Sequence, residues 1–146
     1  MPRPQLKKYL PIVILVLLYL GGRQFFHSRP RPVAVGGNHA LLQAFQQRQS
    51  NVQVQGRGVI VKVLPDDRRG RRHQRFLVRL DDRLTVLIAH NIDLAPRVAK
   101  PAPGQEIAFA GEYEWNRQGG VVHWTHHDPR GRHPDGWLLY QGQKYR

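Results

Sequence analysis

Hydrophobic and polar residues alternate with a period of two along much of the chain after residue 50, which is the pattern of half-buried β-strands. Runs of this kind, bounded by glycine, proline, asparagine or aspartate, predict five strands. They cover residues 51–64, 74–80, 84–89, 106–115 and 121–125. Residues 90–103 contain three prolines and form a long irregular connection between the third and fourth strands. The fold class that this pattern predicts is mostly β.

The first predicted strand changes phase at two glycines. Valines occupy even positions before Gly56 and odd positions after Gly58, which predicts that the strand bends or bulges around a small barrel. Five strands, a long connection after the third and a final hairpin fit a small five-stranded OB-like barrel, strongly bent and antiparallel. An open β-sandwich fragment or an SH3-like barrel has the same periodicity and stays an alternative.

Residues 1–26 have the pattern of a membrane anchor or a signal segment. Basic residues precede Tyr9–Gly22, a run of 14 residues without a charged side chain. A full span needs about 20 apolar residues, so the run is closer in length to the core of a signal peptide. No small-residue cleavage site follows it closely. We therefore expect an uncleaved, single-pass anchor helix in the inner membrane with the domain in the periplasm; secretion after signal cleavage is the alternative.

Residues 27–37 are rich in proline, glycine and arginine and predict a linker. The domain then covers residues 38–146 and begins with a short helix, Ala40–Arg48, whose leucines and Phe45 form one apolar stripe. Asn38 stands where its side chain can cap the first turn of this helix. The predicted organisation is thus an N-terminal anchor or signal, a linker and one OB-like domain.

Charge adds an expectation about partners. The chain carries 23 Lys and Arg against 10 Asp and Glu, a net charge of +13 with a pI near 11.2. Because residues 1–50 contain no acid, the part from residue 51 onward carries only +6. A basic balance favours polyanionic partners such as nucleic acid, acidic polysaccharide or a phospholipid surface. The absence of cysteine excludes a disulfide framework and a thiolate zinc site.

Arginines of the predicted domain gather in the loop between the first two strands and at the start of the second. In an OB barrel this loop is a usual nucleic-acid contact, so these residues are candidates for binding an anionic ligand. A solvated loop beside an anionic membrane is the alternative. The candidates are Arg68, Arg69, Arg71, Arg72 and Arg75.

Histidines crowd the end of the last predicted strand. Imidazole is the commonest metal ligand and the usual acid or base near neutral pH. These residues, with one histidine at the end of the third strand, predict a site for a divalent transition metal, zinc first, with copper or nickel also suited. The candidate ligands are His90, His123, His126, His127 and Asp128. The structural alternative is that His126 and His127 bond to loop carbonyls while Asp128 caps the turn before Pro129.

Glu112 and Glu114 share one face of the fourth predicted strand. Either carboxylate is a candidate general base beside a metal-bound water, and pairing with arginines of the second strand is the alternative. Aromatic residues late in the chain suit stacking against bases or sugars. For some of them, Trp124 included, core packing is the alternative.

Five strings stand out in the domain: HQRF (73–76), AHNIDLAPR (89–97), GEYEWN (111–116), GGxxHWTHHDP (119–129) and HxxGW (133–137). In this order they resemble a small bacterial family of domains of unknown function that are often membrane-anchored. The resemblance covers roughly residues 38–146. It implies an OB-like domain and brings no established activity.

These features predict a membrane-anchored, extracytoplasmic binding module for an anionic ligand, either nucleic acid or polysaccharide, because binding needs only arginine and aromatic surface. The alternative is a metal-dependent hydrolase of phosphodiester-like bonds that uses the histidine cluster. A short similarity to staphylococcal-type nucleases, in Arg79-Leu80 and residues 91–96, points toward this alternative. The sequence does not decide between the two, and no protein partner is inferred.

Overall fold

The computed structural model describes residues 37–146. The expected anchor or signal segment, and the expected linker up to residue 36, lie outside them. The described part contains one short helix and seven strands, which confirms the mostly β expectation. The elements are α2 (His39–Gln46), β1 (Val52–Asp67), β2 (His73–Arg79), β3 (Thr85–Asn91), β4 (Glu106–Glu114), β5 (Val121–His123), β6 (Trp137–Tyr140) and β7 (Gln143–Tyr145). Within this part, no helix is long and apolar enough to cross a membrane.

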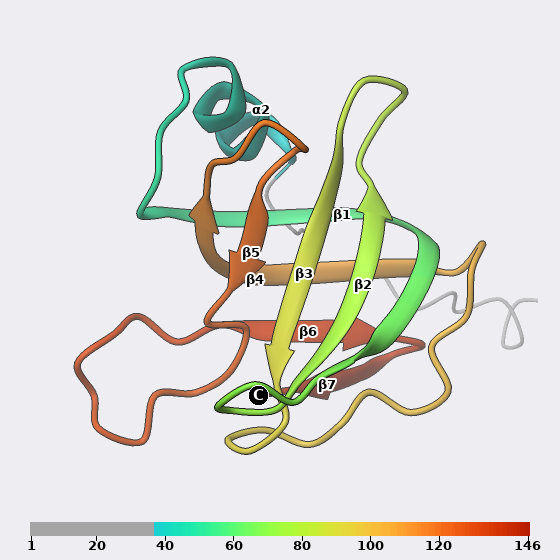
Figure 1. Cartoon of the computed structure of the whole chain (residues 1–146), viewed down its shortest axis with the longest axis vertical. Helices are drawn as coiled ribbons and strands as arrows, with labels where there is room; N and C mark the ends of the chain where they lie inside the picture. Colours follow the sequence, from blue (N-terminus) through green and yellow to red (C-terminus); the bar gives the residue numbers. More distant parts are fainter. Residues whose placement is uncertain (1–36) are drawn as a thin grey trace, which may run out of the picture. The chain divides into compact units, whose positions relative to one another are not determined.

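Five strands form a closed ring in the order β1, β2, β3, β5 and β4, with β4 pairing back onto β1 (Figure 1). β6 and β7 extend the sheet from β4. Neighbours in the ring are antiparallel except for β3 and β5, which are parallel. The expectation that every pair is antiparallel is therefore wrong. A closed ring with an odd number of strands cannot reverse direction at every pair, so one parallel pair is required.

β1 changes partner along its length. Its first half, from Val52, pairs with β4, and from Val59 onward it pairs with β2. The buried positions stay even as far as Ile60. The register with β2 shifts between Ile60 and Lys62, after which Val63 packs against the core. The register shift marks a β-bulge, and the alternation of buried and exposed positions changes phase there. The prediction that it changes phase at Gly56 and Gly58 is wrong.

Gly56 and Gly58 are required for a different reason. Both are buried. A Cβ atom on Gly58 would lie 2.4 Å from the carbonyl oxygen of Arg79, and one on Gly56 would lie 2.8 Å from Cζ of Phe109. The missing side chains let β1 approach β2 closely and leave room for an aromatic ring in the core.

Apolar side chains from every strand of the ring fill its interior. The largest buried ones include Ile60, Phe76, Ile88, Phe109 and Tyr113, and Leu138 of β6 adds to the same core. The hydroxyl of Tyr113 donates to the Gly119 carbonyl at 3.1 Å, and burial raises the pKa of this tyrosine to about 12. The buried ring and its hydrogen bond attach the turn between β4 and β5 to the core.

α2 lies against β1 and buries Leu41 and Ala44. Asn38 occupies the N-cap position, but its side chain makes no capping hydrogen bond. Instead, its amide nitrogen donates to the Arg57 carbonyl and its amide oxygen accepts from the Arg57 N–H, both at 2.9 Å. Asn38, which was predicted to cap the helix, therefore connects the start of the helix to β1. The side chain of an asparagine offers the same donor and acceptor as a peptide group, so it can continue a ladder.

β6 and β7 were not predicted. They form a hairpin whose two turn residues, Gln141 and Gly142, have positive φ angles of 48° and 79°, as a tight two-residue hairpin requires. β6 pairs with residues 107–110 of β4, and β5 pairs with residues 112–114. The two strands therefore share one edge of β4. Between them, residues 124–136 form a loop that leaves and returns at nearly the same place, since the Gly136 N–H donates to the His126 carbonyl at 2.9 Å.

Candidate functional site

Three potential metal ligands meet where β4 and β5 pair. Glu112 and Glu114 lie on the same face of β4 because they are two residues apart, and Glu112 stands directly opposite His123 of β5. Nε2 of His123 lies 3.5 Å from Oε1 of Glu112 and 3.7 Å from Oε1 of Glu114. The His123 side chain is 34% exposed, but its Nε2 atom is buried and has no hydrogen-bond partner among residues 37–146.

The other oxygen of Glu112 is held firmly. Oε2 lies 2.8 Å from Nε2 of His133 and 3.3 Å from Nε2 of Gln53. The His133 ring stacks on Trp124, with ring centroids 4.0 Å apart and planes 9° apart, and its Nδ1 lies 2.8 Å from the Pro134 carbonyl. Both nitrogens of His133 thus face oxygens that only accept.

His90 is buried at the end of β3 and has a partner on each nitrogen. Nε2 lies 3.0 Å from the Pro96 carbonyl, which can only accept, so Nε2 carries the proton. Nδ1 then accepts from the Thr125 hydroxyl at 2.9 Å. Burial is the main reason that the pKa of His90 is lowered to about 4. The neutral ring therefore ties the irregular connection after β3 to the end of β5.

The remaining residues of the predicted cluster organise the loop after β5. Nδ1 of His126 bonds to the His127 carbonyl at 2.7 Å, and Nδ1 of His127 bonds to Asp135 at 2.8 Å. Asp128 is buried and accepts N–H groups from three later loop residues: Arg130, Arg132 and His133. These N–H groups, that of Arg130 first, hold the pKa of Asp128 below its usual range.

The predicted metal ligands therefore separate into two groups. Among residues 37–146, the one set of three potential ligands with all ligand atoms within 4.8 Å of one another is Glu112, Glu114 and His123. His90, His126, His127 and Asp128 are outside it. His126 bonds to a loop carbonyl and Asp128 accepts loop N–H groups, as expected if these two residues hold the loop together rather than bind a metal. The sequence pointed to the two glutamates as general bases and did not indicate His133, although the period of two in β4 already placed both carboxylates on one face.

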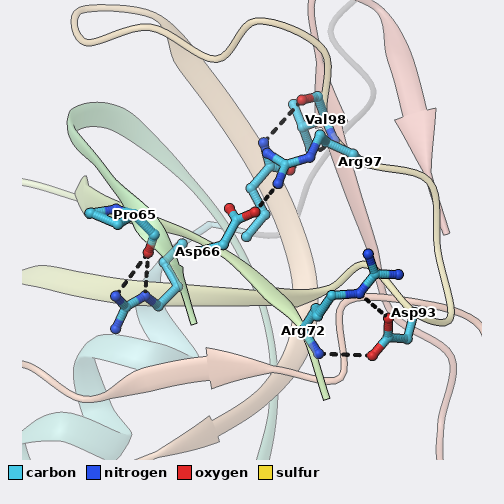
Figure 2. A network of polar contacts seen from close by, with 8 residues as sticks. Pro65, Asp66, Arg72, Asp93, Arg97 and Val98 are labelled. Atoms are coloured by element: carbon cyan, nitrogen blue, oxygen red, sulfur yellow. Dashed lines mark hydrogen bonds and ion pairs between the residues drawn. The ribbon is translucent and has the colours of Figure 1, made fainter. Parts of the chain in front are cut away.

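Most arginines of the predicted anion-binding loop have partners within the fold (Figure 2). Arg72 bonds to Asp93 through its side chain at 2.6 Å and its backbone N–H at 2.8 Å, and these contacts hold the pKa of Asp93 low. Arg75 donates twice to the Pro65 carbonyl. Arg69 is exposed beside Asp67, and Arg68 is exposed. Arg97, which the sequence did not single out, pairs with Asp66.

Three adjoining hollows lie on one side of the domain: the first two are lined by residues of β2, β3 and β5, and the third by loop residues only. Their volumes are about 380, 160 and 450 Å³. The first two share His73 and His123, and the last two share Arg71 and Trp124. We call these three adjoining hollows together the basic groove. Its lining residues are Asp67, Arg71, His73, Arg75, Leu87, Ala89, Asn91, Leu94, Glu114, Val121, His123, Trp124, His126, Asp128, Pro129, Arg130, Arg132 and His133.

The fold and the groove define a small β domain with a basic, histidine-rich hollow on one face of its strand ring. The chain belongs to the family described as "Protein of unknown function (DUF3465)", whose family model matches residues 27–146. A search of curated proteins found no match.

Proposed function

We propose that the domain is an OB-like binding module whose basic groove holds an extended anionic ligand, with single-stranded nucleic acid favoured over acidic polysaccharide. The order of the ring, with β1 shared between β2 and β4 and with β3 beside β5, supports an OB-like barrel. OB-folds bind oligonucleotides and oligosaccharides on the face of their second and third strands and with the loop between the first two. The basic groove covers this face.

The observation that carries the proposal is that three hollows adjoin one another through shared lining residues, from β2 to the loop after β5. Arginines line both halves: Arg75 in one, and Arg71, Arg130 and Arg132 in the other. A chain of phosphates or carboxylates has its charges spaced along its length, so a long depression with cations at intervals suits it better than a single pocket.

Trp124 favours nucleic acid. It lines two of the three hollows and lies at the middle of the groove. Its φ angle is 54°, a left-handed conformation that is rare for a bulky residue and that tends to occur at ligand sites. The Trp124 side chain is partly exposed, and stacking of a base on an aromatic ring contributes about 1–3 kcal/mol.

The test is a titration of the full-length chain with an oligothymidylate and with an acidic polysaccharide over a range of salt concentrations. We expect Arg71→Gln to weaken oligonucleotide binding about threefold to tenfold and to lower the salt slope by roughly 0.7. Trp124→Leu should weaken binding by a similar factor at every salt concentration, because stacking is not screened.

Arg83→Gln is the matched control, since this exposed arginine of the β2–β3 turn lies outside the groove. Equal weakening by the control and by Arg71→Gln would contradict the groove proposal. Tighter binding of the polysaccharide, with the same dependence on Arg71, would move the ligand class to polysaccharide.

We further propose that residues 9–22 hold the protein in the inner membrane with the domain in the periplasm. The basic flank, the uncharged apolar run and the lack of a nearby cleavage site support this. Membrane fractionation and protease accessibility in spheroplasts test it. A mature chain beginning near Gly22 or Gly37 would show instead that the segment is a cleaved signal.

The second candidate function is a metal-dependent hydrolase of phosphodiester-like bonds. The observation that favours it is that Glu114 and His123 line the groove, so an ion held between them would face a bound ligand. Hydrolysis of bis(p-nitrophenyl) phosphate that requires added divalent metal and stops with chelator would support it. Binding without such hydrolysis would leave the binding module as the function.

A further inference from the structure

We propose that Glu112, Glu114 and His123 form a binding site for one divalent transition-metal ion, with zinc as the first choice. The set combines two carboxylate oxygens and one imidazole nitrogen, a combination that suits zinc and its neighbours. This ligand set differs from the one that the histidine-rich segment predicts, because two of its three members come from β4. The site stands independently of which ligand the basic groove binds.

The spacing of the three ligand atoms fits an ion. Bonds of about 2.0–2.1 Å in a tetrahedral arrangement place ligand atoms about 3.3–3.4 Å apart. Nε2 of His123 lies 3.5 Å and 3.7 Å from the two carboxylate oxygens, and all three atoms lie within 4.8 Å of one another. Only a small inward movement of the glutamate side chains is needed. Strand pairing sets this spacing, because Glu112 and His123 are register partners.

Ordinary hydrogen bonding does not account for His123. Its Nε2 is buried beside two carboxylates, yet both oxygens lie beyond good hydrogen-bond distance and no other described residue bonds to the atom. The other oxygen of Glu112 gives a comparison, since Oε2 lies 2.8 Å from Nε2 of His133, which is a normal hydrogen-bond distance. A buried nitrogen without a partner is unfavourable unless something binds it. A metal ion between the three atoms satisfies Nε2 and both oxygens at once.

The surroundings orient the ligands as in known metal sites, where ligating carboxylates are themselves hydrogen-bonded. Gln53 and His133 both contact Oε2 of Glu112, which leaves Oε1 directed toward His123. The stack on Trp124 fixes the His133 ring in turn. His133 is therefore a positioning residue for Glu112.

Three protein ligands leave a tetrahedral ion with an open position, which is the arrangement of catalytic and ligand-binding zinc sites. Glu114 and His123 line the 380 Å³ end of the basic groove, so the ion is accessible from this hollow. An oxyanion entering the groove then has both a metal ion and arginines to bind.

The test measures metal binding with zinc alone. The full-length chain is stripped with chelator and titrated with zinc against a chromophoric competitor, and cobalt(II) is used as a spectroscopic substitute. We expect one ion per chain and a cobalt spectrum with the visible d–d bands of a low-coordinate site. Glu114→Gln and His123→Gln should each weaken zinc binding at least about tenfold. His133→Gln should weaken it less, because it acts through Glu112.

Two controls separate the site from adventitious binding. Glu106→Gln removes an exposed carboxylate from the start of the same strand, and His39→Gln removes an exposed imidazole elsewhere. Both should bind zinc as the wild type does. Absence of the cobalt bands, or zinc binding that survives Glu114→Gln and His123→Gln but falls in His39→Gln, would overturn the proposal. Loss of oligonucleotide binding in Arg71→Gln, which touches none of the three ligands, leaves this result unchanged, so the two proposals fail separately.

Discussion

Two histidines on neighbouring strands of the ring illustrate opposite uses of the same side chain. His90 at the end of β3 is fully buried, and each of its nitrogens has a hydrogen-bond partner. His123 in β5 is partly exposed, and its buried Nε2 has no hydrogen-bond partner in the described part of the chain. The first arrangement is complete without a ligand and stabilises the fold. The second is incomplete, and we infer that it is where an ion binds.

The acidic residues show the same difference. Asp128 accepts three backbone N–H groups and so determines the shape of the loop after β5. Glu112 and Glu114 instead direct one oxygen each toward His123 at distances of 3.5 and 3.7 Å. A local density of metal-ligand residue types is therefore a weak guide to a site. Whether their polar atoms already have partners in the fold is a better one.

The largest effect is expected from His90→Ala. The change removes a buried ring and leaves the Pro96 carbonyl and the Thr125 hydroxyl without partners. We expect the free energy of unfolding, measured in urea at pH 7.5, to fall by about 4 kcal/mol. Zinc affinity of the folded fraction should not change. A loss below about 1 kcal/mol would mean that His90 is not structural.

A smaller effect is expected from acid on the wild type. The pKa of His90 is lowered from 6.5 to about 4 in the folded protein. Because the unfolded chain binds this proton first, the stability due to neutral His90 is complete above pH 6.5 and is lost as the pH falls toward 4. The loss is of the order of 3 kcal/mol. His90→Gln should lose distinctly less between the same two pH values. An unchanged pH dependence in this variant would assign the effect to other groups.

Asp128→Ala should have a local effect. Without the carboxylate, the N–H groups of Arg130, Arg132 and His133 lose their acceptor. We expect hydrogen exchange at these three amides to become at least about tenfold faster, while amides of β2 and β3 keep their protection. Uniformly faster exchange across the sheet would show that the loop is coupled to global stability.

The smallest effect is expected from His123→Gln in metal-free buffer. Since Nε2 of His123 makes no hydrogen bond, removing the ring should change the free energy of unfolding by no more than about 0.5 kcal/mol. Added zinc should then raise the unfolding temperature of the wild type and leave that of the variant unchanged. If metal-free His123→Gln is strongly destabilised, His123 stabilises the fold as His90 does, and the contrast between the two histidines is wrong.

Much of the fold was predictable because strand formation depends on local alternation. The predicted strands 74–80 and 84–89 agree with β2 and β3 to within one or two residues at each end. In both, apolar side chains that become buried alternate with residues that stay partly exposed. β6 and β7 were missed because the four residues of β6 are all apolar and β7 contains a single apolar residue, so neither shows apolar and polar residues in alternation. The Gln141-Gly142 turn was the only local sign of their hairpin.

The sequence predicted which types of residue form the candidate site, but it did not predict which of these residues lie together. The sequence drew attention to His123 and to both glutamates, but it placed His123 with its neighbours along the chain. Along a strand, neighbouring side chains point to opposite faces, and register across strands determines which groups meet. Sequence neighbours such as His126 then bond to the loop itself.

By itself the amino-acid sequence determined the mostly β fold, the positions of the principal strands and the basic character of the domain, because these follow from periodicity and composition. Tertiary structure alone decided the parallel β3–β5 pair, the bulge after Ile60 and the meeting of Glu112, Glu114 and His123. These features depend on the closure of the strand ring and on register between strands. Both are set by contacts between residues far apart in the chain, which no local pattern encodes.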